Sequence, residues 1–225
     1  MPDHCKHCSF NTRAAAVLSE EHFKALSANH LELALNKGDP IIKQGMYSTN
    51  VVFLRKGLVK IHITGPYHEQ IVRLVKAPTY LGLPTTFGDK INQYSVTAIS
   101  DVEVCYIDIN IFRRILTENR EFSEEIITEL SQHELELYHR CANRTQKQIR
   151  GNMADVLIEF ADKIFHTHKF ILPVSQTELA NLVDTSRESV SRVMNEFDRD
   201  GLIRVKGKNI EVLNMESLRL ISKNG

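Results

Sequence analysis

The sequence predicts an α+β fold in which a β-rich first half is followed by a helical second half. Short apolar segments between residues 38 and 116, joined by Gly, Pro and Asp turns, favour a β-barrel or double-sheet roll. A long helical run over residues 110–143 comes next. Two short helical patterns and a β-hairpin complete the chain, which at 225 residues can hold one large domain or two small ones.

Composition and sequence motifs indicate whether the protein spans a membrane, is secreted, binds nucleic acid or is an enzyme. Hydrophobic residues make up 42% of the chain, yet no apolar run approaches the ~18 residues of a membrane-spanning helix. The N-terminus MPDHCKHCSF lacks the apolar core of a signal peptide, so we expect a cytoplasmic protein. The 28 basic and 28 acidic residues cancel, so local charge placement, not net charge, must indicate any nucleic-acid binding. We expect no enzymatic activity, because no nucleophile–base pair, P-loop or complete metal tetrad can be placed.

Four cysteines in an intracellular chain indicate metal binding, redox chemistry or plain burial before structural disulfides. Cys5 and Cys8 form a CxxC pair, which is a moderate metal signal. Structural zinc normally takes four ligands, and the sequence has no second CxxC. No metal-ligand set is therefore assigned from the sequence, and the alternatives stay open.

Apolar spacing predicts one short helix over residues 20–35, with Phe23, Leu26, Leu31 and Leu35 on one face. From Lys37 the pattern changes to the alternation of strands. Strands are predicted at residues 51–54, 58–64, 70–75, 94–99 and 102–107. Two histidines in this region are expected at the surface, because nothing nearby completes a ligand set: His62 and His68.

The helical run over residues 110–143 begins with a short element and continues as a longer helix. Ile127, Leu130, Leu137 and Cys141 lie on a near-heptad seam of the longer helix. Such a stripe is either core within one domain or the interface with a second copy of the chain. We favour pairing with a twin helix, in which Cys141 lies near the twofold axis as a small apolar residue.

A helix-turn-helix is predicted after residues 153–165, which form a helix of their own. Ser175 and Glu178 form a capping box that starts the first helix. Asp184 suits the turn, because Asp tolerates left-handed backbone angles better than most residues. One side of the second helix is expected to be buried and carries Ser186, Val190, Val193 and Phe197.

The other side of the second helix carries Arg187, Glu188, Ser191 and Arg192. Two arginines, a carboxylate and a hydroxyl in the first two turns are typical of a helix that reads the DNA major groove. The plainer interpretations are that Glu188 closes a capping box with Thr185, that the arginines are simply solvated, and that the helix serves protein contacts.

A β-hairpin over residues 202–213 is predicted to follow the second helix as a wing. Lys206 and Lys208 lie at its tip, where they can contact phosphate, although solvated lysines in a turn are equally ordinary.

The motif SRESVSR at residues 186–192, followed by DGLI at residues 200–203, resembles the recognition helix of the Crp/Fnr family, named after the cyclic-AMP receptor protein and the fumarate-nitrate-reduction regulator. The resemblance implies an N-terminal β-roll like that of cyclic-nucleotide-binding domains, a dimerisation helix and a C-terminal winged helix-turn-helix. The corresponding division is residues 1–20 for an N-terminal segment, 21–117 for the roll, 118–145 for the helix and hinge, and 146–225 for the DNA-binding domain.

The implied function is that of a homodimeric, sequence-specific transcription regulator, in which a signal at the roll repositions the recognition helices on an inverted-repeat site. Its partners are double-stranded DNA, a second copy of the chain and RNA polymerase. The alternative is a regulatory or adaptor protein of the cyclic-nucleotide-binding fold that does not read DNA. The expected DNA-contacting residues are Ser175, Thr185, Ser186, Arg187, Glu188, Ser191, Arg192, Lys206 and Lys208.

The resemblance also locates an effector pocket. Where the family pattern has Gly-Glu-Leu, this chain has Gly82-Leu83-Pro84, and the phosphate-binding Arg-Ser pair falls near Asn92-Gln93. A cyclic phosphate needs a cation, which arginine supplies bidentately. Without it, and without a carboxylate for the ribose, we expect the pocket, which also includes Tyr94, not to hold cyclic AMP.

The oxygen-sensing branch of the family holds a [4Fe–4S] cluster through clustered N-terminal cysteines and one distant cysteine. Cys5 and Cys8 resemble two of the clustered set, and Cys105 resembles the distant one. The remaining clustered cysteine falls at Ala14. Because cluster ligation ordinarily takes four ligands, we expect no cofactor, with a three-thiolate iron–sulfur site as the alternative.

Overall fold

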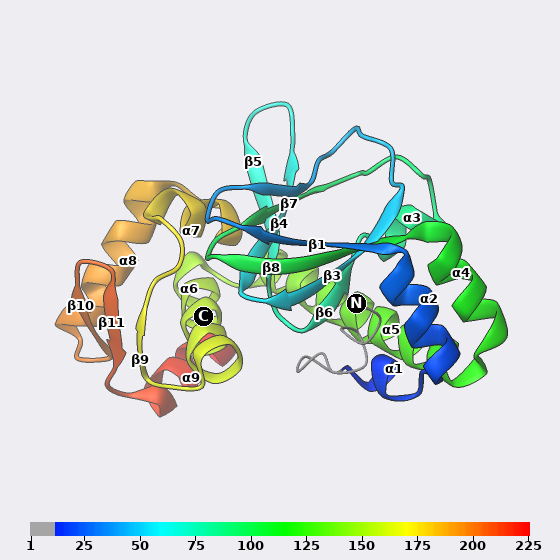
Figure 1. The fold of residues 1–225 in the computed structure, drawn as a ribbon. Coiled ribbons are helices and arrows are strands. Elements are labelled where there is room, and N and C mark those ends of the chain that lie inside the picture. Colours follow the sequence, from blue (N-terminus) through cyan, green and yellow to red (C-terminus); the bar gives the residue numbers. More distant parts are fainter. Residues whose placement is uncertain (1–11) are drawn as a thin grey trace. The chain divides into compact units, whose positions relative to one another are not determined.

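The computed structural model describes residues 12–225, which divide into two compact units (Figure 1). The first unit comprises the described residues up to Tyr67 together with Val72–Leu135. The second comprises His68–Ile71 and Glu136–Gly225. Across residues 12–225, none of the helices combines the length and the apolar character that crossing a membrane requires.

The first unit is built on two four-stranded antiparallel sheets, which is the double-sheet roll that the sequence predicts. In spatial order, one sheet consists of β1 (His30–Leu35), β8 (Val102–Asp108), β3 (Asn50–Lys56) and β6 (Thr79–Leu81). The other consists of β2 (Pro40–Ile42), β7 (Ser95–Ala98), β4 (Leu58–Thr64) and β5 (Glu69–Lys76).

Successive side chains of a strand point to opposite faces of its sheet. In β3 and β8, the side chains of both faces contribute to a core. Val52 and Leu54 join the core between the sheets, together with residues of β4 and β7. Val51 and Phe53 join a second core beneath the helices of the unit. These helices are α1 (Arg13–Ala16), α2 (Glu20–Ala28), α3 (Leu83–Phe87), α4 (Ile109–Glu118) and α5 (Arg120–Gln146).

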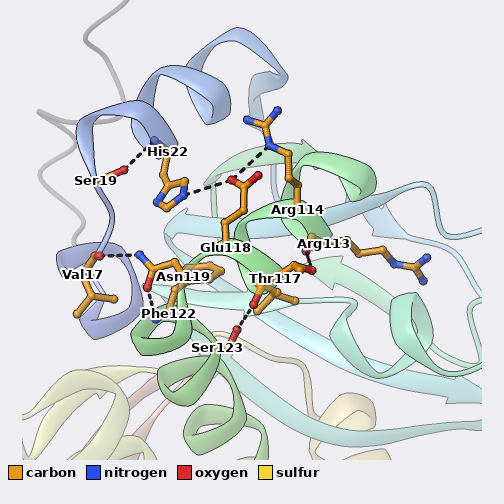
Figure 2. A network of polar contacts seen from close by, with 11 residues as sticks. Val17, Ser19, His22, Arg113, Arg114, Thr117, Glu118, Asn119, Phe122 and Ser123 are labelled. Carbon is orange, nitrogen blue, oxygen red and sulfur yellow. Dashed lines mark hydrogen bonds and ion pairs between the residues drawn. The ribbon is translucent and has the colours of Figure 1, made fainter.

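Polar contacts fix α1 and α2 onto the junction between α4 and α5 (Figure 2). The Asn119 side-chain amide donates to the Val17 carbonyl oxygen at 2.9 Å and accepts from the Phe122 N–H at 2.9 Å. His22 of α2 faces the Glu118 carboxylate, with 3.6 Å between Nε2 and Oε2. The N-terminal helices are therefore an integral part of the first unit.

The single helix predicted over residues 20–35 is wrong in its second half. Asn29 ends α2, its N–H donating to the Leu26 carbonyl and its side chain to the Ala25 carbonyl. Residues His30–Leu35 instead form β1, paired along its length with β8. The apolar spacing of Leu31 and Leu35 suits either structure, and pairing with a strand some 70 positions later decides between them.

The prediction that His62 lies at the surface is wrong. His62 is only 8% exposed, and its Nε2 lies 2.9 Å from the hydroxyl oxygen of Thr97. The neighbouring strand β7 covers the histidine and supplies this partner, which no local sequence pattern reveals. His68 has an exposed side chain, as predicted.

The second unit surrounds a helix-turn-helix with one further helix on each side and a small sheet. Its elements are α6 (Ile149–Ile158), continuing as the π-helical η1 (Glu159–Phe165), then β9 (Lys169–Ile171), α7 (Gln176–Val183), α8 (Arg187–Arg199), β10 (Ile203–Lys206), β11 (Asn209–Val212) and α9 (Met215–Asn224). The sheet has the order β10-β11-β9, and its first two strands form the predicted hairpin. The helix predicted over residues 153–165 has four apolar side chains buried in the core of the second unit: Val156, Leu157, Phe160 and Ile164.

Candidate nucleic-acid interface

The first helix of the helix-turn-helix, α7, begins with the predicted capping box. The Ser175 N–H donates to the Glu178 carboxylate at 2.9 Å, and the Glu178 N–H donates to the Ser175 hydroxyl at 3.2 Å. At the other end Asp184 adopts the left-handed conformation, with φ 57° and ψ 59°. These local signals set where the helix begins and how the chain turns towards α8.

The prediction that Ser186 lies on the buried side of α8 is wrong. The N-cap is Ser186, whose exposed hydroxyl accepts from the Ser189 N–H at 3.2 Å. Ser186 is therefore not part of the buried face, and the N-cap is not Thr185, as the alternative capping box with Glu188 would require. Thr185 and Ser186 are both residue types that cap helices well. With Ser186 as the cap, Val190 and Phe197 are fully buried.

The exposed face of α8 carries the predicted reading residues. Arg187, Glu188 and Arg192 are exposed and Ser191 is half-buried. Together with Asn195, Glu196, Arg199 and Gln176 of α7, they line an open surface groove. Within residues 12–225, neither Arg187 nor Arg192 takes part in an ion pair, so both guanidinium groups remain available to an external anion.

An arginine that sequence reasoning missed holds α8 in place. Arg150 of α6 pairs with Glu196 at 3.5 Å and with Asp200 at 3.0 Å, and its guanidinium lies over the ring of Phe197. These contacts fix the last turn of α8 to α6, although no local sequence motif around Arg150 predicts them.

The wing is attached directly to α8. The carboxylate of Asp198 accepts from the Val205 N–H at 2.9 Å, and the exposed Lys206 and Lys208 flank the turn between β10 and β11. On β11, a hydrogen bond from Lys169 outweighs the effect of burial and, with Arg204, holds the pKa of Glu211 below its ordinary value. The hairpin is thus braced by charge pairs on β9 and β10, while the tip lysines stay exposed.

The positions expected to form the effector pocket are largely closed or already paired. Leu83 is 2% exposed and packs in the core beneath the helices, and Asn92 is buried, with its backbone bonded to residues 45 and 46. The Gln93 amide donates to the carboxylate of Asp89. Burial raises the pKa of Tyr94, although a hydrogen bond with Thr85 acts in the opposite direction. None of the five expected pocket residues supplies a cation or a carboxylate.

The predicted seam lies on the surface of α5. Ile127 is 61% exposed, Leu137 is 37% exposed and Cys141 is exposed, whereas Leu130 packs partly against the core of the first unit. Two apolar side chains that the sequence reasoning did not single out share this exposed helix: Leu135 at 58% and Tyr138 at 61%.

The expected cysteine set is only partly within the described residues. Cys5 and Cys8 lie outside them. Cys105 is a buried thiol on β8, and Ala14, at the position of the remaining clustered cysteine, is a buried methyl group on α1. Among residues 12–225, the candidate positions thus offer one thiol, and the expectation about a cluster stays a prediction.

Each half of the chain matches the profile of a known protein family. The profile of the cyclic nucleotide-binding domain matches residues 32–119, and that of the Crp-like helix-turn-helix domain matches residues 152–221. Electron transport regulator A of Shewanella oneidensis is 23% identical over 235 residues, covering 98% of this chain and 91% of that protein. Transcriptional activator protein FnrA of Stutzerimonas stutzeri is 25% identical over 219 residues, covering 93% and 88%.

Solved structures share the fold. FixK2 of Bradyrhizobium japonicum superposes with a TM-score of 0.78 at 15% identity, covering 85% of this chain and 96% of its own. TTHA1359, a CRP/FNR-family transcriptional regulator of Thermus thermophilus, gives 0.73 at 24% identity, covering 86% and 99%. The α+β architecture and the family resemblance predicted from the sequence are both confirmed, and the chain is a transcription regulator of the Crp/Fnr family with a helix-turn-helix DNA-binding domain.

Proposed function

We propose that this regulator binds an inverted-repeat DNA site as a homodimer, with α8 of each subunit in the major groove. The observation that carries the proposal is the exposed face of Arg187, Glu188, Ser191 and Arg192, whose two guanidinium groups have no ion-pair partner in the described part of the chain. The arginines suit guanine O6 and N7, and Glu188 suits the amino group of cytosine. Ser191 contacts a base or a phosphate.

The remaining residues of the interface position the protein on the duplex. Lys206 and Lys208 at the wing tip contact phosphates, as does the hydroxyl of Thr185. Ser175 and Ser186 contribute mainly through the capping bonds that orient α7 and α8, because their hydroxyls are already engaged.

The homodimer forms through the exposed seam of α5. Exposed apolar side chains at Ile127, Leu135, Leu137 and Tyr138 are costly to leave in water and gain stability by pairing with a second copy. A twofold dimer presents two α8 helices, so the half-sites lie one helical turn, ~34 Å, apart. The family resemblance favours a TGTGA-like half-site.

A signal received at the roll sets the position of the recognition helices, and the bound dimer then acts on RNA polymerase in the cytoplasm. The signal is not cyclic AMP, because none of the five expected pocket residues is charged. A relative from Mycobacterium tuberculosis is named a CRP-like cAMP-activated global transcriptional regulator, and one from Vibrio cholerae is named a fumarate and nitrate reduction regulatory protein, so family membership alone does not fix the effector.

The test begins by selecting bound duplexes from a random pool and measuring affinity for the preferred site and for random DNA. Arg192→Ala should cost ~1–3 kcal/mol on the preferred site, roughly 5- to 150-fold in Kd, and little on random DNA. Arg219→Ala is the matched control, because this arginine lies on α9 and pairs with Asp162.

Equal losses on both DNAs would show that Arg192 meets only phosphate. Failure of the unmodified chain to bind any duplex would favour the alternative, an adaptor protein of the same fold.

A further inference from the structure

Three side chains with metal-binding atoms meet at the edge of the sheet in the first unit. His30, Glu32 and Cys105 each offer one ligand atom, and these atoms lie within 4.8 Å of one another. The antiparallel register sets Glu32 directly opposite Cys105, and strand periodicity puts His30 on the same face as Glu32. The cluster thus depends on residues 30–35 being a strand.

The imidazole of His30 is oriented as in known metal sites. Its Nδ1 lies 3.0 Å from the Leu26 carbonyl oxygen and 3.1 Å from that of Ser27. Carbonyl oxygens only accept hydrogen bonds, so Nδ1 is the donor to these carbonyls and Nε2 is the ring nitrogen that faces the cluster. Metal-binding histidines are commonly held in this way, by a carbonyl on the nitrogen that does not bind the metal.

Nε2 of His30 faces the carboxylate of Glu32. Oε1 of Glu32 lies 3.2 Å from Nε2, so the two atoms share a proton in a hydrogen bond, and a cation bound to both atoms would take the place of that proton. The C-terminal end of α2 and the first residues of β1 therefore bring a ring nitrogen and a carboxylate oxygen together where a positive ion can bind.

The carboxylate of Glu32 is oriented by a second contact. Its Oε2 accepts from the guanidinium of Arg55 at 2.7 Å, which leaves Oε1 facing the cluster. Burial raises the pKa of this carboxyl, but His30 and Arg55 together outweigh burial and hold it below its ordinary value. Arg55 is thus a supporting partner of the kind that ligating carboxylates have.

We propose that His30 Nε2, Glu32 Oε1 and Cys105 Sγ bind one Zn²⁺ ion, with water as the fourth ligand. Zinc prefers nitrogen, sulfur and carboxylate ligands at ~2.0–2.3 Å, which sets tetrahedral ligand–ligand separations of roughly 3.3–3.6 Å. The Nε2–Oε1 separation of 3.2 Å lies just below the lower end of this range. On binding, the Cys105 thiol gives its proton to solvent, and thiolate and carboxylate together balance the two charges of the ion.

The site is reachable from solvent and independent of DNA reading. The Glu32 side chain is 37% exposed, whereas that of His30 is 11% exposed and Cys105 is buried. The ion enters past the carboxylate and joins the end of α2, β1 and β8, so zinc should stabilise the first unit by binding its folded form. Neither Cys5 nor Cys8 is needed for this ligand set.

The experiment uses the full chain carrying Cys5→Ser, Cys8→Ser and Cys141→Ser, so that Cys105 is the only thiol. Co²⁺ replaces Zn²⁺ as a spectroscopic probe, because a cobalt–thiolate bond gives a charge-transfer band and tetrahedral cobalt gives intense visible absorption. One Co²⁺ per chain should bind with both signals, and Zn²⁺ should displace it. His30→Gln should weaken binding at least about tenfold and Cys105→Ser should abolish the thiolate band.

His168→Gln is the matched control, because this histidine lies on an exposed segment of the second unit and should not change cobalt binding. Thermal unfolding with and without Zn²⁺ provides a second readout: zinc should raise the Tm of the three-serine chain and leave that of the His30→Gln variant unchanged. If Cys105→Ser does not fold, Glu32→Gln replaces it, with the visible absorption as the readout. Absence of the thiolate band in the three-serine chain, or equal cobalt affinity with and without His30, would overturn the proposal.

Discussion

The recognition face of α8 and the expected effector pocket of the roll differ in the exposure and charge of their side chains. On α8, two arginines and a glutamate are exposed, and the arginines have no ion-pair partner in the described structure. In the pocket, Leu83 is sealed in a core, Asn92 is buried and Gln93 is bonded to a neighbouring carboxylate. This difference in available charge supports both proposals, namely that α8 binds DNA and that the pocket does not bind a cyclic nucleotide.

The largest expected effect concerns the pocket. A cyclic phosphate keeps its negative charge, and burying it without a cation costs several kcal/mol; the unpaired ribose hydroxyl adds ~1–3 kcal/mol. Two such losses move a micromolar ligand towards millimolar affinity. Isothermal titration with cyclic AMP and cyclic GMP should therefore show no saturable binding at micromolar concentrations.

Binding of either nucleotide tighter than about 10 μM would break the comparison. The charge would then have to come from Arg73, which already acts on Tyr94, and Arg73→Ala should abolish the binding.

A second test asks whether the exposed face of α5, which carries Ile127 and Leu137, forms the dimer interface. We expect a dimer of about 51 kDa, twice the 25.7 kDa of one chain. Ile127→Glu with Leu137→Glu should dissociate it, because a charge buried without a partner costs several kcal/mol, while both positions are exposed in the single chain. Sedimentation velocity at micromolar concentration measures the change.

Gln132→Glu is the control for added charge, because position 132 lies about 140° round the helix from Ile127. A folded monomer of the unmodified chain at micromolar concentration would contradict the proposed assembly.

A smaller effect is expected at the wing. Lys206→Ala with Lys208→Ala should weaken binding to preferred and random DNA alike, because phosphate contacts carry no sequence information. The slope of log K against log salt should fall by about 0.9 for each lost contact, which titration at several salt concentrations measures. An unchanged slope would mean that both lysines remain in solvent, and selective loss on the preferred site would mean base contact.

The smallest expected effect is a pH dependence within the wing. The pKa of Glu211 is lowered by the hydrogen bond from Lys169 and by Arg204, so its contribution to stability is present above pH 4.5 and is lost as the pH falls through the folded-state pKa. Glu211→Gln should therefore lower Tm slightly at pH 7 and hardly at all at strongly acidic pH. A difference in Tm that is the same at both pH values would assign the effect to packing.

The helix-turn-helix was predictable because its signals are local. The capping box at Ser175 and the left-handed turn at Asp184 stand within a few residues of what they determine. The placement of Ser186 on the buried face was wrong, because its i, i+4 spacing to the buried Val190 fits the apolar stripe, whereas its hydroxyl caps the helix from an exposed position.

The roll was predictable as an architecture and less so in its details. Residues 30–35 fit a helix or a strand, and only pairing with β8 decides. In a helix, His30 and Glu32 point about 200° apart, so the helical interpretation hid the cluster that they form with Cys105. His62 was misplaced for the same reason: Thr97 and the strand that covers it are distant in sequence.

The attachment of α8 has a consequence for how target specificity changes during evolution. Arg150, Asp198 and the Ser186 cap hold this helix, and none of their contacts passes through Arg187, Glu188, Ser191 or Arg192. Substitutions at such exposed positions usually change stability by no more than about 0.5 kcal/mol. If α8 reads DNA as proposed, gene duplicates of this regulator can acquire new operators by exchanging a few surface side chains, while the same scaffold continues to fold.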